Sequence, residues 1–422
     1  MSDQSWTASL EVCTYTGIGF SLNQVYRNSQ EEHYYEDYKC YHKFRPNFYY
    51  YAIFDGHAGS EIAKFCSDKL TAELYFAQIK DDATDDAVRK ILREVFFLVE
   101  KEYMEYVGSL AAERTILLED IKGLTPTETN KEFPGVLEKL KQINNKLSSG
   151  TACAVALILN NKLYVANVGN CRVLLCQTDE NDVMKVVELS VEHNLNNQDE
   201  LLRLSQLGIK VDILKNASTL GNQENTRCLG NYMIKGCYKE FKDLETAIQE
   251  PITAEPDING GISLDESCKF LLLMSSGLLK TVGEVVTAEQ VNKYIAQCVV
   301  EQFREQTNLN RVAQGVIDKI VRIHQDHYMT DPSKLKNRED ITLMVRNFNF
   351  PLHSDTSYST YNAVTASHNF SSTSSSGPMN TLQMNGLGPD QKIKAYVDFN
   401  DFYVCLEKAK KEGRCPEWMK DL

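Results

Sequence analysis

The sequence predicts an α+β fold, because its helical and β-prone segments occur in blocks and do not alternate along the chain. Apolar residues recur at helical spacing over residues 62–74 and again over residues 88–99. Consecutive β-prone runs then fill residues 151–176, and two more apolar runs follow at 270–274 and 341–348. A parallel βαβ sheet would show regular alternation, so the blocks favour layers of antiparallel sheet and helix.

Two amphipathic helices are expected near the start of the domain. The first follows Ser60, and the second begins near Val88. Their apolar positions are three or four residues apart, which is the spacing of one helix face. These positions are Ile62, Phe65, Cys66, Leu70 and Leu74 in the first helix, and Val88, Ile91, Leu92, Val95 and Val99 in the second.

Short apolar runs bounded by turn residues predict the strands. Residues 47–54 are rich in aromatic side chains, and residues 151–159, 162–168 and 172–176 are β-prone. Asn-Asn and Gly-Asn turns separate the last three runs. We therefore expect these three strands to form an antiparallel meander.

Composition and charge limit the possible partners and compartments. The 422-residue chain has a formal net charge of −13, whereas nucleic acids and anionic membranes select basic surfaces. The first twenty residues do not resemble a secretory signal, and no apolar run approaches the ~18 residues of a membrane span. We expect a cytoplasmic protein with protein partners and no nucleic-acid or membrane partner. Its twelve scattered cysteines should be reduced thiols, mostly in the core.

Composition changes abruptly after the last apolar run. Residues 354–376 hold nine Ser and four Thr in 23 positions, with few aliphatic side chains. Such a segment cannot bury enough apolar area to offset its chain entropy, so we expect disorder. The prediction is a globular domain at 1–350, a linker at 351–392 and a binding segment at 393–422. The linker is either a bare spacer or a target of phosphorylation.

Three segments of the globular part are specific when taken together. Residues 47–59 read N-F-Y-Y-Y-A-I-F-D-G-H-A-G. Residues 149–176 read S-G-T-A-C-A-V-A-L-I-L-N-N-K-L-Y-V-A-N-V-G-N-C-R-V-L-L-C, and residues 339–348 read E-D-I-T-L-M-V-R-N-F. In this order they resemble the metal-dependent type 2C Ser/Thr phosphatase family. The resemblance implies two packed antiparallel sheets flanked by helices. For active members it implies two divalent cations between the sheets, sharing a water that attacks the substrate phosphate.

The resemblance leaves three residual metal ligands in this chain. Hard divalent cations take oxygen ligands, and two such cations held close together need several carboxylates to offset their repulsion. The F-D-G-H segment keeps Asp55, which bridges both ions in the family, and Gly56, whose carbonyl is a ligand there. Glu339 keeps the charge of the last ligand position with one methylene more. Asp55, Gly56 and Glu339 are therefore the expected residual ligands.

The other ligand positions of the family lack a carboxylate in this chain. Gln24 and Val25 stand where the family has an acidic pair after Asn23. Ser276 and Lys280 replace two acids of one later motif. Asn170 and Asn231 replace two accessory acids. No arginine precedes Asn23 to grip a substrate phosphate. We therefore expect no two-metal site and no cofactor, although weak binding of a single Mg²⁺ or Mn²⁺ ion stays open.

Three further groups allow a structural and a functional interpretation. Glu36–Asp37 could supply the acidic pair if its loop turns toward the site, but a solvated loop pair is favoured. His57 is expected to be a structural histidine and not a metal or phosphate contact. His324 and His327 are expected on a solvated helix face and not at zinc.

The segment 395–411 carries one apolar stripe of a short helix. Phe399, Phe402, Tyr403 and Leu406 recur at i, i+3, i+4 and i+7. A helix this short is marginal alone, which favours docking in a partner groove over packing on its own domain. Its Y-V-D-F-x-x-F-Y motif resembles the docking helix of adaptors in this family that bind TGF-β-activated kinase, a MAP kinase kinase kinase. The resemblance assigns kinase binding to Tyr396, Val397, Asp398, Phe399, Phe402, Tyr403 and Leu406.

The sequence thus supports three functional hypotheses. The favoured one is a catalytically inactive adaptor that binds this kinase, promotes its autophosphorylation, and offers its globular domain to other signalling proteins. The second is a metal-dependent Ser/Thr phosphatase with weak residual activity. The third is a scaffold that binds phosphoproteins without turnover.

Overall fold

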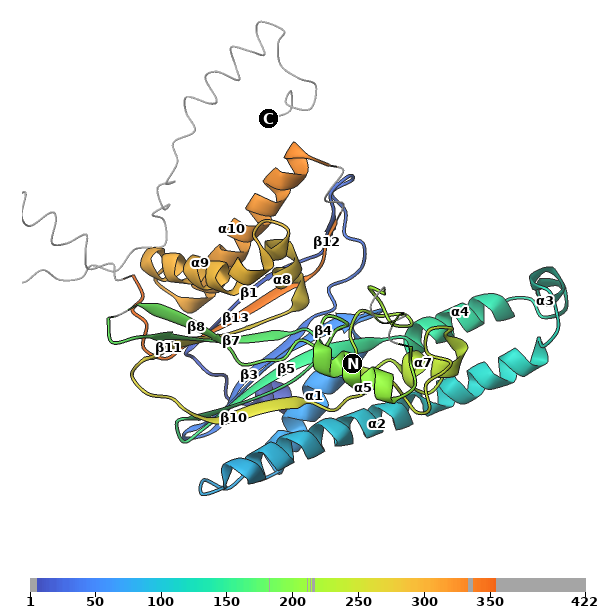
Figure 1. Cartoon of the computed structure of the whole chain (residues 1–422), viewed down its shortest axis with the longest axis horizontal. Coiled ribbons are helices and arrows are strands. Elements are labelled where there is room, and N and C mark those ends of the chain that lie inside the picture. Colours follow the sequence, from blue (N-terminus) through green and yellow to red (C-terminus); the bar gives the residue numbers. More distant parts are fainter. Residues whose placement is uncertain are drawn as a thin grey trace, which may run out of the picture. The chain divides into compact units, whose positions relative to one another are not determined.

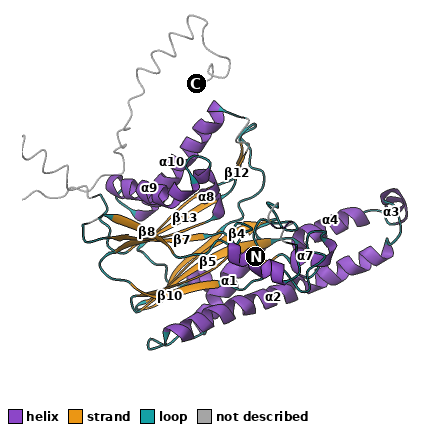
Figure 2. Cartoon of the chain, viewed as in Figure 1, coloured by secondary structure: helices purple, strands orange, loops and turns teal. Residues whose placement is uncertain are grey.

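Two antiparallel β-sheets packed face to face form the centre of the domain, and helices cover both outer faces (Figure 1, Figure 2). This computed structural model describes residues 6–181, 183–210, 212, 214, 217–332 and 337–353. From residue 354 on, the predicted linker and kinase-binding helix lie outside the described residues. The predicted α+β fold with two flanked antiparallel sheets is confirmed.

The elements follow one another as labelled in Figure 1. The strands are β1 (Thr16–Ser21), β2 (Gln24–Val25), β3 (Tyr38–Arg45), β4 (Phe48–His57), β5 (Gly150–Leu159), β6 (Lys162–Val168), β7 (Arg172–Thr178), β8 (Met184–Glu188), β9 (Leu229–Gly230), β10 (Asp257–Ser263), β11 (Cys268–Met274), β12 (Asn337–Arg338) and β13 (Ile341–Asn347). The helices are α1 (Glu61–Phe76), α2 (Asp85–Asp120), α3 (Pro126–Glu132), α4 (Val136–Leu147), α5 (Gln198–Gln206), α7 (Tyr232–Lys235), α8 (Ser276–Gly283), α9 (Val291–Glu305) and α10 (Leu309–Thr330).

The first sheet has the order β10-β6-β5-β4-β3, with β9 beside β5, and the second has the order β1-β13-β11-β7-β8. Apolar side chains of the two sheets meet in a shared core, for example Ala154 and Val165 from the first with Val173 and Leu273 from the second. The outer face of the first sheet packs on α1 and α2, and that of the second packs on α8, α9 and α10. This layering leaves the strand ends between the sheets free to carry polar groups.

The predicted meander was wrong at one connection. β5 and β6 pair as expected, but β7 lies in the second sheet, between β11 and β8. The chain changes sheets at Gly169, whose φ is +83°. A Cβ on Gly169 would come within 2.5 Å of the Cβ of Ala152, so only glycine fits there. The turn that looks like a hairpin in the sequence is therefore a crossover between sheets.

Helix α1 follows Ser60 as predicted, but α2 extends 36 residues, well past the predicted segment 88–99. The side chain of Thr84 caps the start of α2 by accepting a hydrogen bond from the Ala87 N–H at 3.3 Å. Beyond Val99, its buried positions include Arg114, which donates to Glu240. The apolar period therefore weakens along the second half of α2, which is why the sequence pattern understates its length.

Most of the described cysteines lie in the domain core. The ten described cysteines are free, and all except Cys237 are buried. Burial raises the pKa of Cys66 and Cys153 well above the ordinary range, so these thiols stay protonated. Among the described residues, no helix combines the length and the apolar character that crossing a membrane requires.

Helix α10 covers the open edge of β1 at very close range. The backbone N–H of Phe20 donates to Oε1 of Gln314 at 3.1 Å, so the helix supplies a partner to the edge strand. A Cβ on Gly17 would lie 2.0 Å from the carbonyl oxygen of Leu309, and a Cβ on Gly19 would lie 2.5 Å from the carbonyl carbon of Ala313. The two glycines therefore set the distance between β1 and α10.

Gly19→Ala is expected to lower the free energy of unfolding by about 3 kcal/mol, because the added methyl must push α10 away from β1. The measurement is urea unfolding followed by circular dichroism. Gly108→Ala is the matched control, because no atom lies within 4 Å of the added Cβ inside α2, and it should stabilise by roughly 0.5–1 kcal/mol. Equal effects of the two substitutions would contradict the close packing.

Candidate functional site

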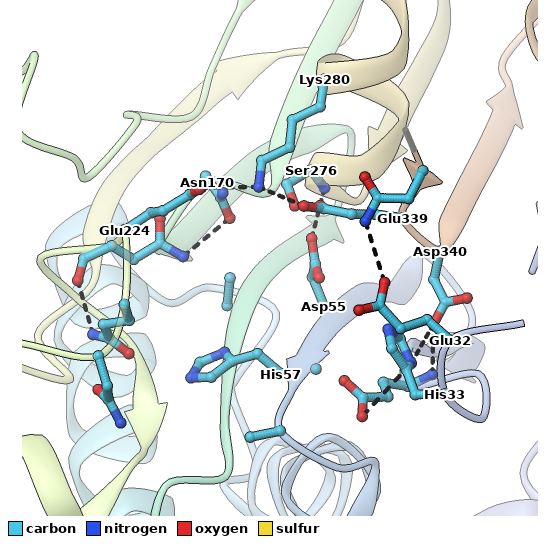
Figure 3. Close-up of a pocket in the computed structure, with 18 residues that line it drawn as sticks. Glu32, His33, Asp55, His57, Asn170, Glu224, Ser276, Lys280, Glu339 and Asp340 are labelled. Atoms are coloured by element: carbon cyan, nitrogen blue, oxygen red, sulfur yellow. Dashed lines mark hydrogen bonds and ion pairs between the residues drawn. The ribbon is translucent and has the colours of Figure 1, made fainter. Parts of the chain in front are cut away.

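A cleft of about 500 Å³ lies where strand ends of both sheets meet (Figure 3). Its walls come from the loop before β3, the end of β4, the β6–β7 crossover, residues 222–225, the start of α8 and the junction of β12 with β13. Among the described lining residues, one lysine and no arginine face six carboxyl groups. These are Lys280 against Glu32, Glu36, Asp55, Glu224, Glu339 and Asp340.

Strand β4 places Asp55 in this cleft, where its backbone pairs with Ala152 of β5. The backbone N–H of Ser276, at the start of α8, donates to Oδ2 of Asp55 at 2.6 Å. Burial raises the pKa of Asp55 to about 6, although the hydrogen bonds from Ser276 lower it. Asp55 and the adjoining Gly56 therefore lie together at the cleft, with one Asp55 oxygen already bound by the first residue of α8.

The acidic pair of the cleft is Glu36–Asp37, so its assignment to Gln24 and Val25 was wrong. Glu36 lines the cleft and is 9% exposed, and Asp37 is 4% exposed. Burial, followed by the charge of Asp55, raises the pKa of Asp37 well above its ordinary range. The interpretation of the pair as a solvated loop was also wrong, because both carboxyl groups are buried beside the site.

Gln24 and Val25 have a structural role. They form β2, which pairs with Asn337 and Arg338 of β12. The loop that follows β2 carries the chain back to the cleft at Glu36. A count of positions from Asn23 therefore misses the acidic pair, and the adjacency of Glu36 and Asp37 was itself the sequence signal for it.

Asp340 forms hydrogen bonds with two segments near the cleft, at Asn23 and at Glu36. Its Oδ1 accepts hydrogen bonds from the backbone and side-chain N–H groups of Asn23 at 2.7 and 2.9 Å. Its Oδ2 accepts from the backbone N–H of Glu36 at 2.9 Å. Both oxygens of Asp340 thus have partners within the chain, and these hydrogen bonds use three of its about four acceptor positions.

Lys280 lies across the cleft between two carboxylates (Figure 3). Its Nζ is 2.8 Å from Oε1 of Glu339 and 2.8 Å from Oε2 of Glu224. Burial alone would lower the pKa of Lys280, but these two carboxylates hold it above its ordinary range. Glu339, expected as a residual metal ligand, is therefore paired with an ammonium group. The sequence did not indicate Glu224 as a partner, because 56 residues separate it from Lys280.

The residues of the cleft do not fit a pair of divalent cations. Ser276 offers a hydroxyl in place of a carboxylate, the oxygens of Asp340 are engaged, and Lys280 brings a positive charge among the acids. Asn170 lines the cleft without a charge, and Asn231 lies buried at the start of α7. In the part of the chain that the structure describes, no group of three or more His, Cys, Asp or Glu side chains could hold a metal ion.

His57, His324 and His327, the three histidines singled out in the sequence, lie in different environments. His57 lines the cleft, and burial lowers its pKa to about 4, so it is neutral near pH 7. His324 is 1% exposed and hydrogen-bonds with Tyr26 and Glu284, so its predicted solvated position was wrong. It follows Ile320 by one turn on the buried face of α10, whereas His327 is exposed as predicted.

Asp55→Asn is expected to change the pH dependence of stability. Because the folded-state pKa of Asp55 lies near 6, above its ordinary 3.8, the stability that comes from its protonated form is present below about pH 4 and lost as the pH rises through 6. At pH 7 the variant should be about 3 kcal/mol more stable than the natural chain, and at pH 4 the two should nearly match. Urea unfolding at both pH values measures this, and a difference that is the same at both would contradict it.

The amino-acid sequence of this chain is similar to known proteins. A model of the family described as protein phosphatase 2C matches residues 17–328. The chain is 26% identical over 301 residues to a Caenorhabditis elegans protein named TGF-beta-activated kinase 1 and MAP3K7-binding protein 1, covering 70% of each chain. It is 28% identical over 273 residues to probable protein phosphatase 2C 2 of Paramecium tetraurelia, covering 64% of this chain and 75% of that protein.

Solved structures share the fold at low sequence identity. The serine-threonine phosphatase 2C of Toxoplasma gondii matches with a TM-score of 0.52 and 14% identity, over 81% of this chain and 98% of the other. A sex-determining protein of C. elegans matches with a TM-score of 0.50 and 13% identity, over 81% of this chain and 65% of the other. At these identities the likeness concerns the fold alone.

Proposed function

This chain belongs to the protein phosphatase 2C family, and we propose that it is a member without phosphatase activity that acts as an adaptor for a protein kinase. In this proposal, residues 393–422 bind TGF-β-activated kinase or a similar MAP kinase kinase kinase and promote its autophosphorylation. The phosphatase-like domain serves as a platform for other signalling proteins. The protein acts in the cytoplasm, needs no cofactor, and has neither nucleic acid nor membrane as a partner.

One observation carries the proposed loss of activity. The ammonium group of Lys280 lies 2.8 Å from both Glu224 and Glu339, among the carboxyl groups of the cleft. Two-metal hydrolysis needs cations that are held between carboxylates and that activate a water. Lys280 neutralises carboxylates as a cation would, but an ammonium group has no open coordination position for that water. The cleft is thus stabilised in a form that does not supply the nucleophile.

The kinase-binding half of the proposal is supported by a relative and by the tail motif. The C. elegans relative, whose name refers to binding of TGF-beta-activated kinase 1 and MAP3K7, aligns with 70% of this chain. The tail keeps Phe399, Phe402, Tyr403 and Leu406 at the spacing of one helix face. Large aromatic side chains in such a stripe are typical anchors in a partner groove.

Deletion of residues 393–422 tests the adaptor function. We expect the shortened chain to lose kinase pull-down and to lose stimulation of kinase autophosphorylation, while its circular dichroism and unfolding curve stay those of the full chain. Retention of both binding and stimulation would contradict the proposal.

A weakly active phosphatase is the second candidate, supported by Glu36, which lines the cleft with Asp55, and by the buried Asp37, whose pKa the charge of Asp55 helps to raise. Ser276 and Lys280 stand against it. The two candidates differ in metal-stimulated hydrolysis of a phosphopeptide, which only the phosphatase would catalyse.

A further inference from the structure

The cleft contains carboxylates whose hydrogen-bonding capacity is only partly used. Among the described residues, Glu36 accepts a hydrogen bond from the Gly59 N–H at 2.7 Å, and His33 approaches it only to 3.8 Å. In the described part of the chain, the carboxylate of Asp55 accepts hydrogen bonds from Ser276. An ionised carboxylate has about four acceptor positions, so both side chains can bind further donors from the cleft.

Lys280 demonstrates which chemistry this cleft accepts. Its ammonium group is held at 2.8 Å by Glu224 and by Glu339, which come from different loops. The same cleft still contains Glu32, Glu36 and Asp55, which Lys280 does not contact in the described interactions. One basic side chain is thus already bound inside the chain, and acidic groups for a second one remain.

The side chain of Asn225 is a second, independent observation, because its oxygen accepts no hydrogen bond. It is 8% exposed, its Nδ2 donates to Oδ1 of Asn170 at 3.2 Å, and its own Oδ1 has no hydrogen-bond partner. A buried acceptor without a donor costs roughly 1–3 kcal/mol. Asn225 lines both the cleft and an adjoining cavity of about 490 Å³, which also share Glu224 and Lys280. The wall between the two cavities therefore suits a ligand that donates hydrogen bonds.

We propose that this cleft binds an arginine side chain presented by an unphosphorylated segment of a protein partner. A guanidinium group stays charged, presents five N–H donors in one plane, and pairs with carboxylates in a bidentate manner. Asp55 and Glu36 supply the carboxylates, and Asn225 supplies a further acceptor. The adjoining cavity gives room for a neighbouring residue of the partner.

The same charges exclude a phosphorylated segment. Six carboxyl groups and one lysine line the cleft, so a phosphate dianion meets repulsion and finds no arginine to bind it. The ligand chemistry is therefore inverted relative to a phosphatase. This inference specifies the partner of the proposed platform and rests on the proposal that no pair of metal ions fills the cleft.

The test is a fluorescence-anisotropy titration of the full chain, in low salt with a chelator, using a labelled peptide acetyl-Gly-Ser-Arg-Ser-Gly-amide. Its matched control carries citrulline, which has nearly the shape of arginine without the charge. A third peptide carries phosphoserine in the same position. We expect the arginine peptide to bind about tenfold tighter than the citrulline peptide, and the phosphoserine peptide to bind weakest. Equal binding of the arginine and citrulline peptides would overturn the proposal.

Variants of the chain locate the binding. Asp55→Asn should weaken the arginine peptide about tenfold, and Lys280→Met should strengthen it, because Glu224 and Glu339 then become free acceptors. Glu132→Gln, at the exposed end of α3, is the control and should change nothing. If Glu132→Gln lowered the affinity for the arginine peptide as much as Asp55→Asn does, the binding would be unspecific charge attraction and the proposal would be overturned.

Calorimetry with Mn²⁺ separates the two ways of failing. If the arginine peptide binds no better than the citrulline peptide and the chain binds no Mn²⁺, this inference alone is overturned. If the chain binds two Mn²⁺ ions, the proposed function is overturned as well.

Discussion

The double variant Ser276→Asp with Lys280→Asp is expected to bind Mn²⁺ at least about tenfold more tightly than the natural chain. The first substitution adds a carboxylate next to Asp55, because the backbone N–H of Ser276 already contacts Asp55 at 2.6 Å. The second removes the ammonium group that now pairs with Glu224 and Glu339 and puts an acid in its place. Hard cations bind in proportion to the number and charge of such oxygen ligands. Isothermal titration calorimetry with the full chain measures the change.

Two controls show whether the gain belongs to the cleft. Lys280→Met removes the charge without adding a ligand and should give only part of the increase. Lys319→Asp on α10 removes a lysine that pairs with Glu301 outside the cleft, and should give none. If the double variant bound Mn²⁺ no better than Lys319→Asp, the missing acids would not be what keeps metal out of the cleft.

Phe399→Ala with Phe402→Ala is expected to abolish kinase binding. Both residues belong to the apolar stripe of the predicted C-terminal helix. Truncation of an aromatic anchor in a protein groove typically costs about 2 kcal/mol or more, so two truncations should lower the affinity by roughly a thousandfold. Surface plasmon resonance with the immobilised kinase measures the loss, and an autophosphorylation assay shows whether activation falls in parallel.

Lys408→Ala is the matched control for the tail. Position 408 lies about 180° from Phe399 on the predicted helix, so this substitution should leave the affinity nearly unchanged. A larger loss with Lys408→Ala than with the two phenylalanine substitutions would mean that the aromatic stripe does not face the kinase.

The fold was predictable where the local pattern and the packing coincide. Residues 162–168 form β6 as predicted, since alternate side chains of this β-prone run enter two apolar cores. Strand β3 was missed, because its eight residues are mostly half-buried and carry mixed polarity. The sheet change at Gly169 depends on the distant contact with Ala152, which no local pattern contains.

Site residues could be predicted from the sequence where they belong to a strand with a recognisable motif. Asp55 was found because F-D-G-H ends β4, whereas Glu36 was misjudged because β2 and a loop separate it from Asn23. The ion pairs of Lys280 were not predictable, since Glu224 and Glu339 reach it only through the folded chain. The sequence correctly indicated a cation at position 280 but not what it binds.

The central claim is that the cleft no longer catalyses phosphate hydrolysis, and one assay tests it most directly. The full chain is incubated with a phosphothreonine peptide over a range of Mn²⁺ and of Mg²⁺ concentrations, beside Asp55→Asn. We expect the phosphate released to be the same for both proteins and independent of metal. Metal-stimulated release by the natural chain that disappears in Asp55→Asn would contradict the account.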